Sequence, residues 1–419
     1  MVISVKAKVK LNKYNNTKVK ISGSKNSSLP IIAASILCDE VVTLHNIPNI
    51  TDVNVLVNIL KYIGYKVEHD NDKLIIHPSH IKKKHFHNSN INKLRGSYYL
   101  IGALIGKFEY SNFSFIHPGG CKLGDRPIDY HIKAFSNMGL NIKTSNNIIK
   151  VKGYKKNIIH NLNYPSVGTT INIILASCKL ESKTIISNAS IEPEVLDLCD
   201  FLKSMGVNII IHNRTITIIG KKYLHKTEYI VMEDRIEAGT FLLIGAIHNG
   251  ITISNINPYN ISYLIHLLKD IGYEICINEK ELTLLPYDIA KIKPFNIILE
   301  PHPGFPTDLG PLMCVLASQI NGTSYITETV FKDRFNHVNE LKKLNIDIKL
   351  ENNKIIVNGR NKIINSVIKA SDLRCAASLV LASSINNNYS IIENIDYLFR
   401  GYENIQNKLN SLGIDFIIQ

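Results

Sequence analysis

The sequence lacks any long hydrophobic run. Among its 419 residues, no window approaches the roughly 18 uninterrupted apolar residues that a membrane-spanning helix needs. Its start, MVISVKAKVKLNKYNN, alternates as a strand does and contains no apolar core of a signal peptide. These two absences predict a cytoplasmic protein that has no membrane partner.

Paired cysteines are also missing. The seven cysteines are scattered and never spaced as Cys-x-x-Cys, which argues against a disulfide framework or a zinc site, so no metal is expected. Cys121 follows two glycines and stands apart by its context. The other six are expected in apolar settings, where cysteine packs as a small hydrophobe: they are Cys38, Cys178, Cys199, Cys276, Cys314 and Cys375.

Acidic residues are in deficit. There are 35 Asp and Glu against 48 Lys and Arg, a formal net charge of +13, and such a balance is typical of proteins that bind nucleic acid, acidic lipid or small anions. The clearest basic run, IKKKHFH from Ile81 to His87, contains no aromatic platform of the kind that single-strand binders use. We interpret it as a solvated loop and predict no nucleic-acid partner.

One short pattern recurs along the whole chain. Amphipathic stretches end in a Gly or Asn, and an alternating strand follows, as in IGYKV, MGLNI, MGVNI, IGYEI, LNIDI and LGIDF. Each is preceded by a polar entry, an Ala- and Leu-rich helix and a β-branched strand, as in DRIEAGTFLLIGAIHNGITISNI. The sequence therefore predicts an α/β protein of six units of about 70 residues, each helix–strand–helix–strand, grouped as two domains of three units. The N-terminal strand has no repeat partner and is expected to complete the far domain.

The segment HPGGCKLGDRPIDYH, from His117 to His131, cannot be a helix. Its glycines permit unusual backbone angles and its prolines interrupt regular hydrogen bonding, which predicts a loop with Cys121 near its tip. The thiolate is the reactive form of cysteine, and the nearby Arg126 lowers the free energy needed to form it. The pattern therefore favours a reactive cysteine.

Charged and polar residues stand at the predicted helix entries. A helix N-terminus attracts anions through its free N–H groups, and Asp308 and Asp372 are expected to serve there as caps as well. Arg126, Arg334 and Arg400 stand instead in turns after strands, where a guanidinium can bind phosphate or carboxylate. The entry residues are Lys25 with Asn26, Arg95, Ser166 with Gly168, Arg235, Asp308, and Asp372 with Arg374.

At these positions the chain resembles the UDP-N-acetylglucosamine 1-carboxyvinyltransferases of the enolpyruvyl transferase family. The resemblance covers essentially the whole chain. It is carried by ISGSKNSSLPI, PGGCKLGDRPIDYH, PSVGTT, EPE, DRIEAGTF, PHPGFPTD, ITETVFKDRFNHV, SDLRCAASL and RGYE.

The resemblance implies two similar domains, each of three βαβαββ repeats that form an inside-out α/β barrel, with an active-site cleft between them. The first domain would span 23–232 and the second 1–22 plus 233–419. The implied reaction transfers enolpyruvate from phosphoenolpyruvate to the 3-hydroxyl of UDP-N-acetylglucosamine and releases phosphate, which opens peptidoglycan synthesis. It needs no metal or organic cofactor, and a monomer is expected.

The resemblance also implies residue roles. Cys121 would protonate the methylene carbon of phosphoenolpyruvate and form an adduct with it, which makes it the target of the epoxide fosfomycin, and Asp308 would accept the proton of the sugar hydroxyl. Phosphoenolpyruvate would be bound by Lys25, Asn26, Arg126, Arg334, Arg374 and Arg400. The UDP-sugar would be bound by Arg95, Arg126, Pro127, Ile128, Asp129, Tyr130, Tyr164, Pro165, Ser166, Val167, Asp308 and Val330.

Three alternatives remain. An enolpyruvyl-shikimate-phosphate synthase has the same fold but lacks the PGGC loop. An RNA 3′-phosphate cyclase needs a histidine near the C-terminus, and no histidine follows His337. A catalytically inactive paralogue with a binding role would not need Cys121, Asp308 and the arginines together.

Overall fold

The computed structural model describes residues 5–119 and 128–419. These residues divide into two compact units. The central unit comprises 23–119 and 128–232, and the terminal unit comprises 5–22 and 233–419. Each unit has its own hydrophobic core. No helix in the described part of the chain has both the length and the apolar character that are needed to cross a membrane.

Three four-stranded sheets form the outer layer of the central unit, in the orders β14-β3-β5-β4, β6-β7-β9-β8 and β10-β11-β13-β12. The strands are β3 (Val42–His45), β4 (Val67–Asp70), β5 (Lys73–Ile76), β6 (His85–Phe86), β7 (Tyr110–Ile116), β8 (Asn141–Ser145), β9 (Ile148–Tyr154), β10 (Ile159–Asn161), β11 (Lys183–Ser187), β12 (Asn208–His212), β13 (Thr215–Ile219) and β14 (Thr227–Ile230).

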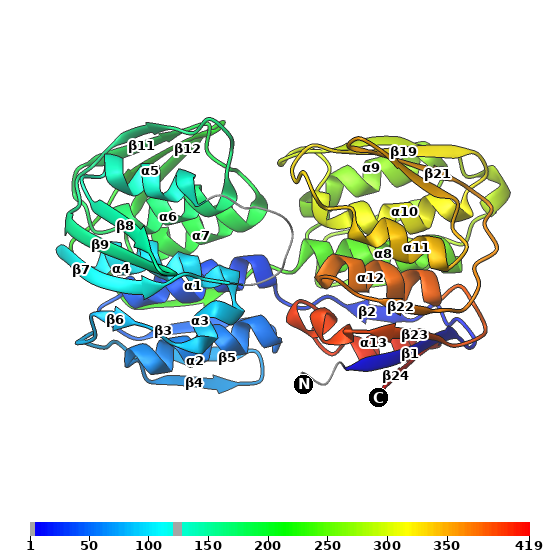
Figure 1. Ribbon diagram of the computed structural model, residues 1–419, viewed down its shortest axis with the longest axis horizontal. Coiled ribbons are helices and arrows are strands. Elements are labelled where there is room, and N and C mark those ends of the chain that lie inside the picture. Colours follow the sequence, from blue (N-terminus) through cyan, green and yellow to red (C-terminus); the bar gives the residue numbers. More distant parts are fainter. Residues whose placement is uncertain (1–4, 120–127) are drawn as a thin grey trace. The chain divides into compact units, whose positions relative to one another are not determined.

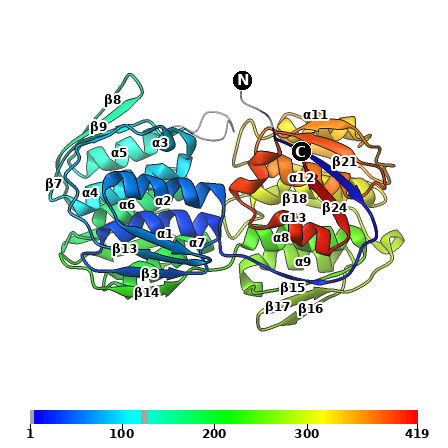
Figure 2. The ribbon, with the colours of Figure 1, turned by 90° about the horizontal axis from the view of Figure 1, so that it is seen from below.

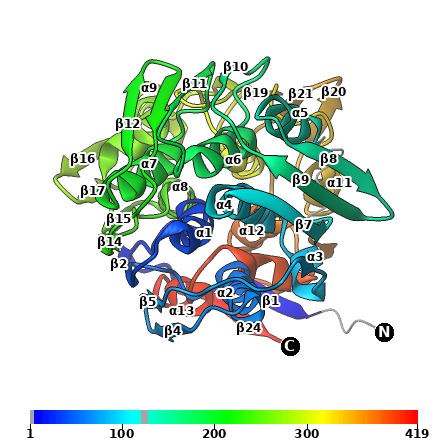
Figure 3. The ribbon, with the colours of Figure 1, turned by 90° about the vertical axis from the view of Figure 1, so that its left-hand side faces the viewer.

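The helices of the central unit are α1 (Lys25–Ala34), α2 (Thr51–Ile63), α3 (Ser89–Lys93), α4 (Tyr99–Lys107), α5 (Asp129–Asn137), α6 (Val167–Ser177) and α7 (Pro193–Ser204), with the 3-10 turns η1 (Ser35–Leu37) and η2 (Arg95–Tyr98). Helices α1, α4 and α6 are apolar over most of their circumference and almost wholly buried. Helix α4 packs against both α1 and α6 (Figure 3). The helices are inside and the sheets outside.

The terminal unit repeats this plan with sheets β22-β23-β1-β24, β16-β17-β15-β2 and β18-β19-β21-β20. Its strands are β1 (Lys6–Leu11), β2 (Lys18–Lys20), β15 (Ile251–Ser254), β16 (Ile275–Asn278), β17 (Glu281–Leu284), β18 (Asn296–Leu299), β19 (Thr323–Glu328), β20 (Ile348–Glu351), β21 (Lys354–Asn358), β22 (Val367–Lys369), β23 (Ser390–Glu393) and β24 (Ile414–Ile418).

The helices of the terminal unit are α8 (Arg235–His248), α9 (Ser262–Ile271), α10 (Gly310–Gln319), α11 (Asn336–Lys343), α12 (Leu373–Ser383) and α13 (Ile405–Ser411), with η3 (Pro258–Ile261), η4 (Ile289–Lys291), η5 (Thr307–Leu309) and η6 (Ile395–Arg400). Helices α8, α10 and α12 are its buried central helices. Helix α13 lies against α8 (Figure 2), where Lys408 forms an ion pair with Glu237.

The repeat in the structure is longer than the helix–strand–helix–strand unit read from the sequence. In 296–358 the order is β18, α10, β19, α11, β20 and β21, a βαβαββ unit whose first strand runs parallel to its second. The missed first strands are very short in several units, such as β6, β10 and β22, and a strand of two or three residues has too few positions to show alternation. The α/β fold class itself is confirmed.

Three strands reach their sheets from outside the repeat that they complete. Strand β1 lies between β23 and β24 (Figure 1), as predicted for the unpartnered N-terminal strand. Strand β2 pairs in parallel with β15, and β14 pairs in parallel with β3. The chain therefore passes from the terminal to the central unit after Ser22 and returns after Met232.

The predicted helix stops are present. Gly64 and Gly272 end α2 and α9 with φ of 119° and 118°, a left-handed backbone that suits glycine. In the fifth repeat Asn345 takes this place, with φ of 67°, and asparagine tolerates the left-handed region better than most residues.

Two sequence interpretations are wrong. The basic run at 81–87 is not wholly a loop, because His85 and Phe86 form β6 and Phe86 is fully buried. Cys276 is not in an apolar setting, because it lies exposed on β16, whereas the other described cysteines are buried. In both cases a short edge strand places alternate residues in the solvent and in the core. The composition of the surrounding sequence does not predict which residue faces which side.

Candidate active site

Asp308 lies at the centre of a buried ion-pair network in the terminal unit. It is in the middle of η5, just before α10. Arg334, from the turn after β19, places Nη2 2.7 Å from Oδ1 of Asp308. Arg374, near the start of α12, places Nη2 2.7 Å from Oδ2. Both arginine side chains are nearly buried, while the Asp308 side chain keeps 25% exposure. The repeats therefore bring three predicted site residues into direct contact.

This network fixes the charge state of Asp308. Burial raises the pKa of the Asp308 carboxyl, but the charges and hydrogen bonds of Arg374 and Arg334 outweigh it and hold the pKa well below its ordinary value. Burial alone would lower the pKa of Arg374, but the charge of Asp308 outweighs burial, so the pKa of Arg374 is raised. Asp308 is therefore an ionised carboxylate at neutral pH and a weak base while both arginines bind it.

Asp308 does not cap a helix, contrary to the sequence-based expectation. No side chain caps either η5 or α10, because both Asp308 oxygens are bonded to arginines. Asp372 does serve as a cap, and its Oδ1 accepts from the backbone N–H groups of Arg374 and Cys375 at 2.9 and 3.1 Å. This cap fixes the backbone from which the Arg374 side chain extends.

A second hydrogen bond holds each guanidinium. Arg334 Nη1 donates to Thr307 Oγ1 at 3.0 Å, and Arg374 Nη1 donates to the hydroxyl of Tyr402 at 3.3 Å. Thr307 and Tyr402 were not among the site residues predicted from the sequence. Their position in the sequence could have indicated them, because they lie inside the motifs PHPGFPTD and RGYE.

Arg400 and Val330 also lie in the terminal unit. Arg400 is the last residue of η6, which packs against α12. Arg334 lies in the turn after β19, as the sequence predicted, whereas Arg400 lies in a 3-10 helix rather than in a turn. Each precedes the amphipathic helix of its repeat. Val330 follows β19, and its N–H donates to Glu328 Oε1 at 2.7 Å.

The central unit holds the remaining described candidates at its helix entries. Lys25 and Asn26 are the first residues of α1, and Lys25 Nζ lies 2.8 Å from Oδ2 of the buried Asp52. Arg95 begins η2, and its guanidinium lies 5.6 Å from the centre of the Tyr98 ring. Burial lowers the pKa of Arg95.

The two segments expected to bind the nucleotide sugar lie beside each other. Ile128 precedes α5, which begins at Asp129, and Ser166 caps α6, which begins at Val167. The end of the segment 117–131 is therefore helical, contrary to the sequence-based expectation. Helix α5 packs against α6. Across this contact His131 Nδ1 and Asn172 Nδ2 are 2.9 Å apart, so the two segments approach the same part of the unit.

Three candidates, Cys121, Arg126 and Pro127, lie outside the described residues. Among the residues that are described, no cluster of three or more His, Cys, Asp or Glu is placed to hold a metal ion. The described candidates of the two units include an ionised carboxylate, several cations and helix N-termini, which are groups suited to anionic substrates and to proton transfer.

The chain belongs to the enolpyruvyl transferase family. The family model of EPSP synthase (3-phosphoshikimate 1-carboxyvinyltransferase) matches residues 9–409, and curated relatives match over nearly their full length. The family predicted from the sequence motifs is therefore confirmed.

Three curated relatives are similar to the chain over nearly their whole length. The chain is 38% identical to the UDP-N-acetylglucosamine 1-carboxyvinyltransferase of Halothermothrix orenii over 95% of each chain. It is 38% identical to that of Pelagibacter ubique, over 94% of this chain and 95% of the relative. It is 37% identical to UDP-N-acetylglucosamine 1-carboxyvinyltransferase 2 of Bacillus subtilis, over 95% and 93%.

Solved structures agree in fold. The enolpyruvyl transferase NikO from Streptomyces tendae superposes with a TM-score of 0.88 at 20% identity over 99% of each chain. EPSP synthase from Acinetobacter baumannii gives 0.75 at 18% identity, over 99% of this chain and 100% of that one. At these identities the likeness concerns the fold, and it confirms the inside-out α/β architecture.

Proposed function

We propose that this chain is a UDP-N-acetylglucosamine 1-carboxyvinyltransferase. It transfers the enolpyruvyl group of phosphoenolpyruvate to the 3-hydroxyl of UDP-N-acetylglucosamine, releases phosphate, and so opens peptidoglycan synthesis. The observation that carries the proposal is the set of relatives with this name, at 36–38% identity over nearly the whole of both chains. The Asp308 network supports it with chemistry that such a reaction needs.

The reaction proceeds by addition and elimination. A proton is added to the methylene carbon of phosphoenolpyruvate, the sugar 3-oxygen bonds to the adjacent carbon as its hydroxyl proton leaves, and phosphate then departs as a methyl proton is lost. This sequence needs an acid for the carbon and a base for the hydroxyl. We assign the acid to Cys121 and the base to Asp308, whose negative charge also stabilises the cationic centre formed on protonation.

Cationic side chains bind the phosphoenolpyruvate. Lys25, Asn26, Arg126 and Arg400 hold the phosphate in this proposal, and Arg334 and Arg374 hold the carboxylate. Guanidinium groups suit this task because they form two parallel hydrogen bonds to a carboxylate or phosphate. Positive charge around the phosphate also favours its departure.

Substrate binding has to change the Asp308 network. The structure pairs Asp308 with the two arginines assigned to the substrate carboxylate, and a carboxylate held this way is a weak base. The incoming carboxylate offers the same guanidinium groups an equivalent partner. An exchange of at least one arginine from Asp308 to substrate therefore raises the basicity of Asp308 when it is needed.

The UDP-sugar is assigned to Arg95, Arg126 to Tyr130, Tyr164 to Val167, Asp308 and Val330. These assignments fall in both units. The central and terminal units correspond in this proposal to the domains 23–232 and 1–22 plus 233–419. The enzyme acts as a cytoplasmic monomer without a cofactor.

A phosphate-release assay tests the function. With phosphoenolpyruvate present, phosphate should appear on addition of UDP-N-acetylglucosamine and not on addition of shikimate 3-phosphate, the acceptor in the name of the matching family model. Release only with shikimate 3-phosphate would make the chain the sister enzyme. Binding of the UDP-sugar without release would instead identify an inactive paralogue.

A further inference from the structure

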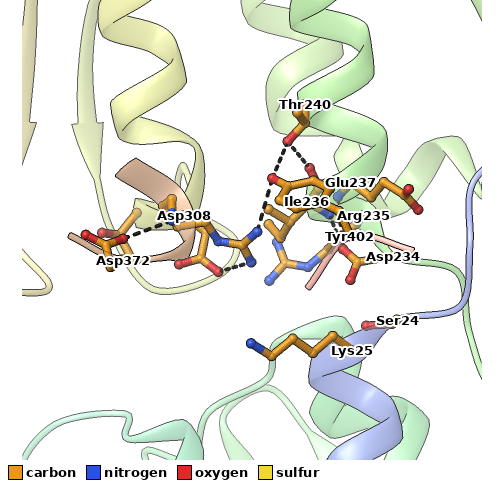
Figure 4. Close-up of polar contacts among 12 residues, drawn as sticks. Ser24, Lys25, Asp234, Arg235, Ile236, Glu237, Thr240, Asp308, Asp372 and Tyr402 are labelled. Atoms are coloured by element: carbon orange, nitrogen blue, oxygen red, sulfur yellow. Dashed lines mark hydrogen bonds and ion pairs between the residues drawn. The ribbon is translucent and has the colours of Figure 1, made fainter. Parts of the chain in front are cut away.

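The hydroxyl of Tyr402 lies between Arg374 and helix α8. Tyr402 follows η6 and is 2% exposed. Its hydroxyl accepts from Arg374 Nη1 at 3.3 Å and lies 2.8 Å from Thr240 Oγ1. Thr240 in turn donates to the backbone carbonyl of Ile236 at 2.8 Å. These residues form a continuous chain of hydrogen bonds (Figure 4).

The available protons decide which residue donates at each step of this chain of hydrogen bonds. Thr240 has one hydroxyl proton, and it is given to the Ile236 carbonyl, so Thr240 must accept from Tyr402. Tyr402 therefore donates to Thr240 and accepts from Arg374. Burial raises the pKa of the Tyr402 hydroxyl, and this effect exceeds the lowering by Arg374 and Thr240, so Tyr402 keeps the proton that the chain requires.

This chain of hydrogen bonds holds the terminal nitrogen of Arg374 that does not contact Asp308. Arg374 Nη2 bonds to Asp308 Oδ2 at 2.7 Å and Nη1 bonds to Tyr402. We propose that Tyr402 is a positioning residue of the reaction, supported by Thr240, and that it keeps the Arg374 guanidinium oriented while Arg374 exchanges Asp308 for the substrate carboxylate. This inference rests on the proposed role of Arg374 in binding phosphoenolpyruvate.

Arg334 is held in the same manner by different residues. Its Nη2 bonds to Asp308, and its Nη1 donates to Thr307, whose hydroxyl donates to the buried Glu328. Glu328 is held in turn by the backbone N–H groups of Val330 and Phe331. Each of the two arginines thus binds the Asp308 carboxylate through one terminal nitrogen. Its other terminal nitrogen donates to a hydroxyl group that is itself hydrogen-bonded within the fold. The recurrence of this arrangement from unrelated residues argues for a role in orientation.

The kinetic test compares Tyr402→Phe with Tyr273→Phe. Tyr402→Phe removes only the hydroxyl that Arg374 contacts. Tyr273 is also 2% exposed and donates its hydroxyl to the Ala246 carbonyl near the other end of α8. We expect Tyr402→Phe to lower kcat/KM for phosphoenolpyruvate about tenfold, mainly through KM, because one hydrogen bond to a charged group is lost. The affinity for the UDP-sugar should stay unchanged, and Tyr273→Phe should behave as the wild type.

A second pair of variants covers the case in which Tyr402→Phe folds poorly. Thr240→Val removes the hydroxyl that accepts from Tyr402, and Thr240→Ser keeps it. The valine variant should reproduce the rise in KM for phosphoenolpyruvate, while the serine variant should restore it to near the wild-type value. The proposal would be overturned if Thr240→Val and Thr240→Ser had equal KM values for phosphoenolpyruvate. Equal KM values in Tyr402→Phe and Tyr273→Phe would overturn it as well.

An unfolding experiment separates this inference from the proposed function. A double-mutant cycle of Tyr402→Phe and Arg374→Met, measured by urea unfolding, needs no substrate. The unfolding equilibrium constants should deviate from additivity about fivefold if Tyr402 holds Arg374. Additive effects would contradict the contact. An inactive wild-type enzyme with a clear deviation would reject the proposed reaction but keep the Tyr402–Arg374 contact.

Discussion

The two units have the same plan of central helices and outer sheets but organise the charges at their helix entries differently. In the terminal unit Asp308, Arg334 and Arg374 form one connected network. In the central unit Lys25 forms an ion pair with Asp52, and Arg95 lies over the ring of Tyr98. A shared fold therefore does not dictate a shared electrostatic arrangement.

This difference has a chemical consequence. The carboxylate of the terminal unit is already neutralised by two cations, so an anionic substrate has to compete with Asp308 for them. In the central unit the contact of Lys25 with Asp52 and that of Arg95 with Tyr98 each involve a single cation. We therefore expect substitutions in the two units to differ in both activity and stability.

The largest expected effect comes from replacing Asp308, which removes the centre of the connected network. Asp308→Asn should lower kcat by a factor on the order of 100 or more, the usual contribution of a general base, and retain most of the affinity for the UDP-sugar. Steady-state kinetics and titration calorimetry measure the two quantities. A turnover within tenfold of the wild type would reject Asp308 as the base.

Cys121 is the candidate acid of the same reaction, and its substitution should have an effect of similar or smaller size. Cys121→Ser should lose most turnover, because a serine hydroxyl is a far weaker acid than a thiol, and should resist inactivation by fosfomycin. Cys121→Asp, which keeps an acidic proton, should retain activity and resist the drug. The matched control is Cys276→Ser, since Cys276 is the exposed cysteine among those described. A fosfomycin adduct mapped to Cys276 would contradict the assignment.

A stability comparison sharpens the contrast between the units. Asp308→Asn leaves two nearly buried arginines beside each other, so we expect a loss of about 3 kcal/mol in unfolding free energy at pH 7. Asp52→Asn leaves one lysine whose stem can turn toward water, and we expect about 1 kcal/mol. Urea unfolding of both variants measures the difference.

The pH dependence of this effect has a definite sign. The folded-state pKa of Asp308 is lowered, so its contribution is fully present above its unfolded pKa of about 4 and is lost only as pH falls through the lower folded value. The gap between wild type and Asp308→Asn should therefore be constant from pH 5 to 8. A gap that closes within this range would contradict the ion-paired state.

Two histidines whose pKa is lowered by desolvation give the smallest expected effect, one in each unit. Burial lowers the pKa of His131 in the central unit and of His337 in the terminal unit to about 4. Their neutral forms are favoured in the folded state, so stability is full above about pH 6.5 and declines as pH falls toward 4. At pH 5.5 each should cost about 1 kcal/mol. His131→Gln and His337→Gln should each flatten the pH profile of unfolding, and unchanged profiles would contradict neutral burial.

Much of the fold was predictable from the sequence, because its periodic features are long. Apolar central helices, amphipathic second helices and their Gly or Asn stops recur six times, and the structure confirms them. The short first strands such as β6 and β10 were not predictable, since their pairing depends on neighbours distant in the chain. Cys276 was misplaced for a related reason, because exposure on an edge strand depends on which face the sheet covers.

The residues of the candidate site were predictable from the sequence, but the contacts between them were not. Sequence motifs identified Asp308, Arg334 and Arg374 as candidates, and helix entries and turns explained why they are polar. Their mutual contact could not be derived, because they come from two different repeats whose packing only the fold defines. Tyr402 and Thr240 were missed because a buried hydroxyl that orients another side chain has no sequence pattern of its own.

The most direct test of the proposed chemistry is mass spectrometry of the UDP-sugar product formed in D₂O. Protonation of the methylene carbon by an exchangeable acid, followed by loss of a methyl proton, should place solvent deuterium on the vinyl group of the product. The account predicts UDP-N-acetylglucosamine that carries an enolpyruvyl group with deuterium in its methylene position. An enolpyruvyl product free of deuterium, or no transfer to this sugar at all, would contradict it.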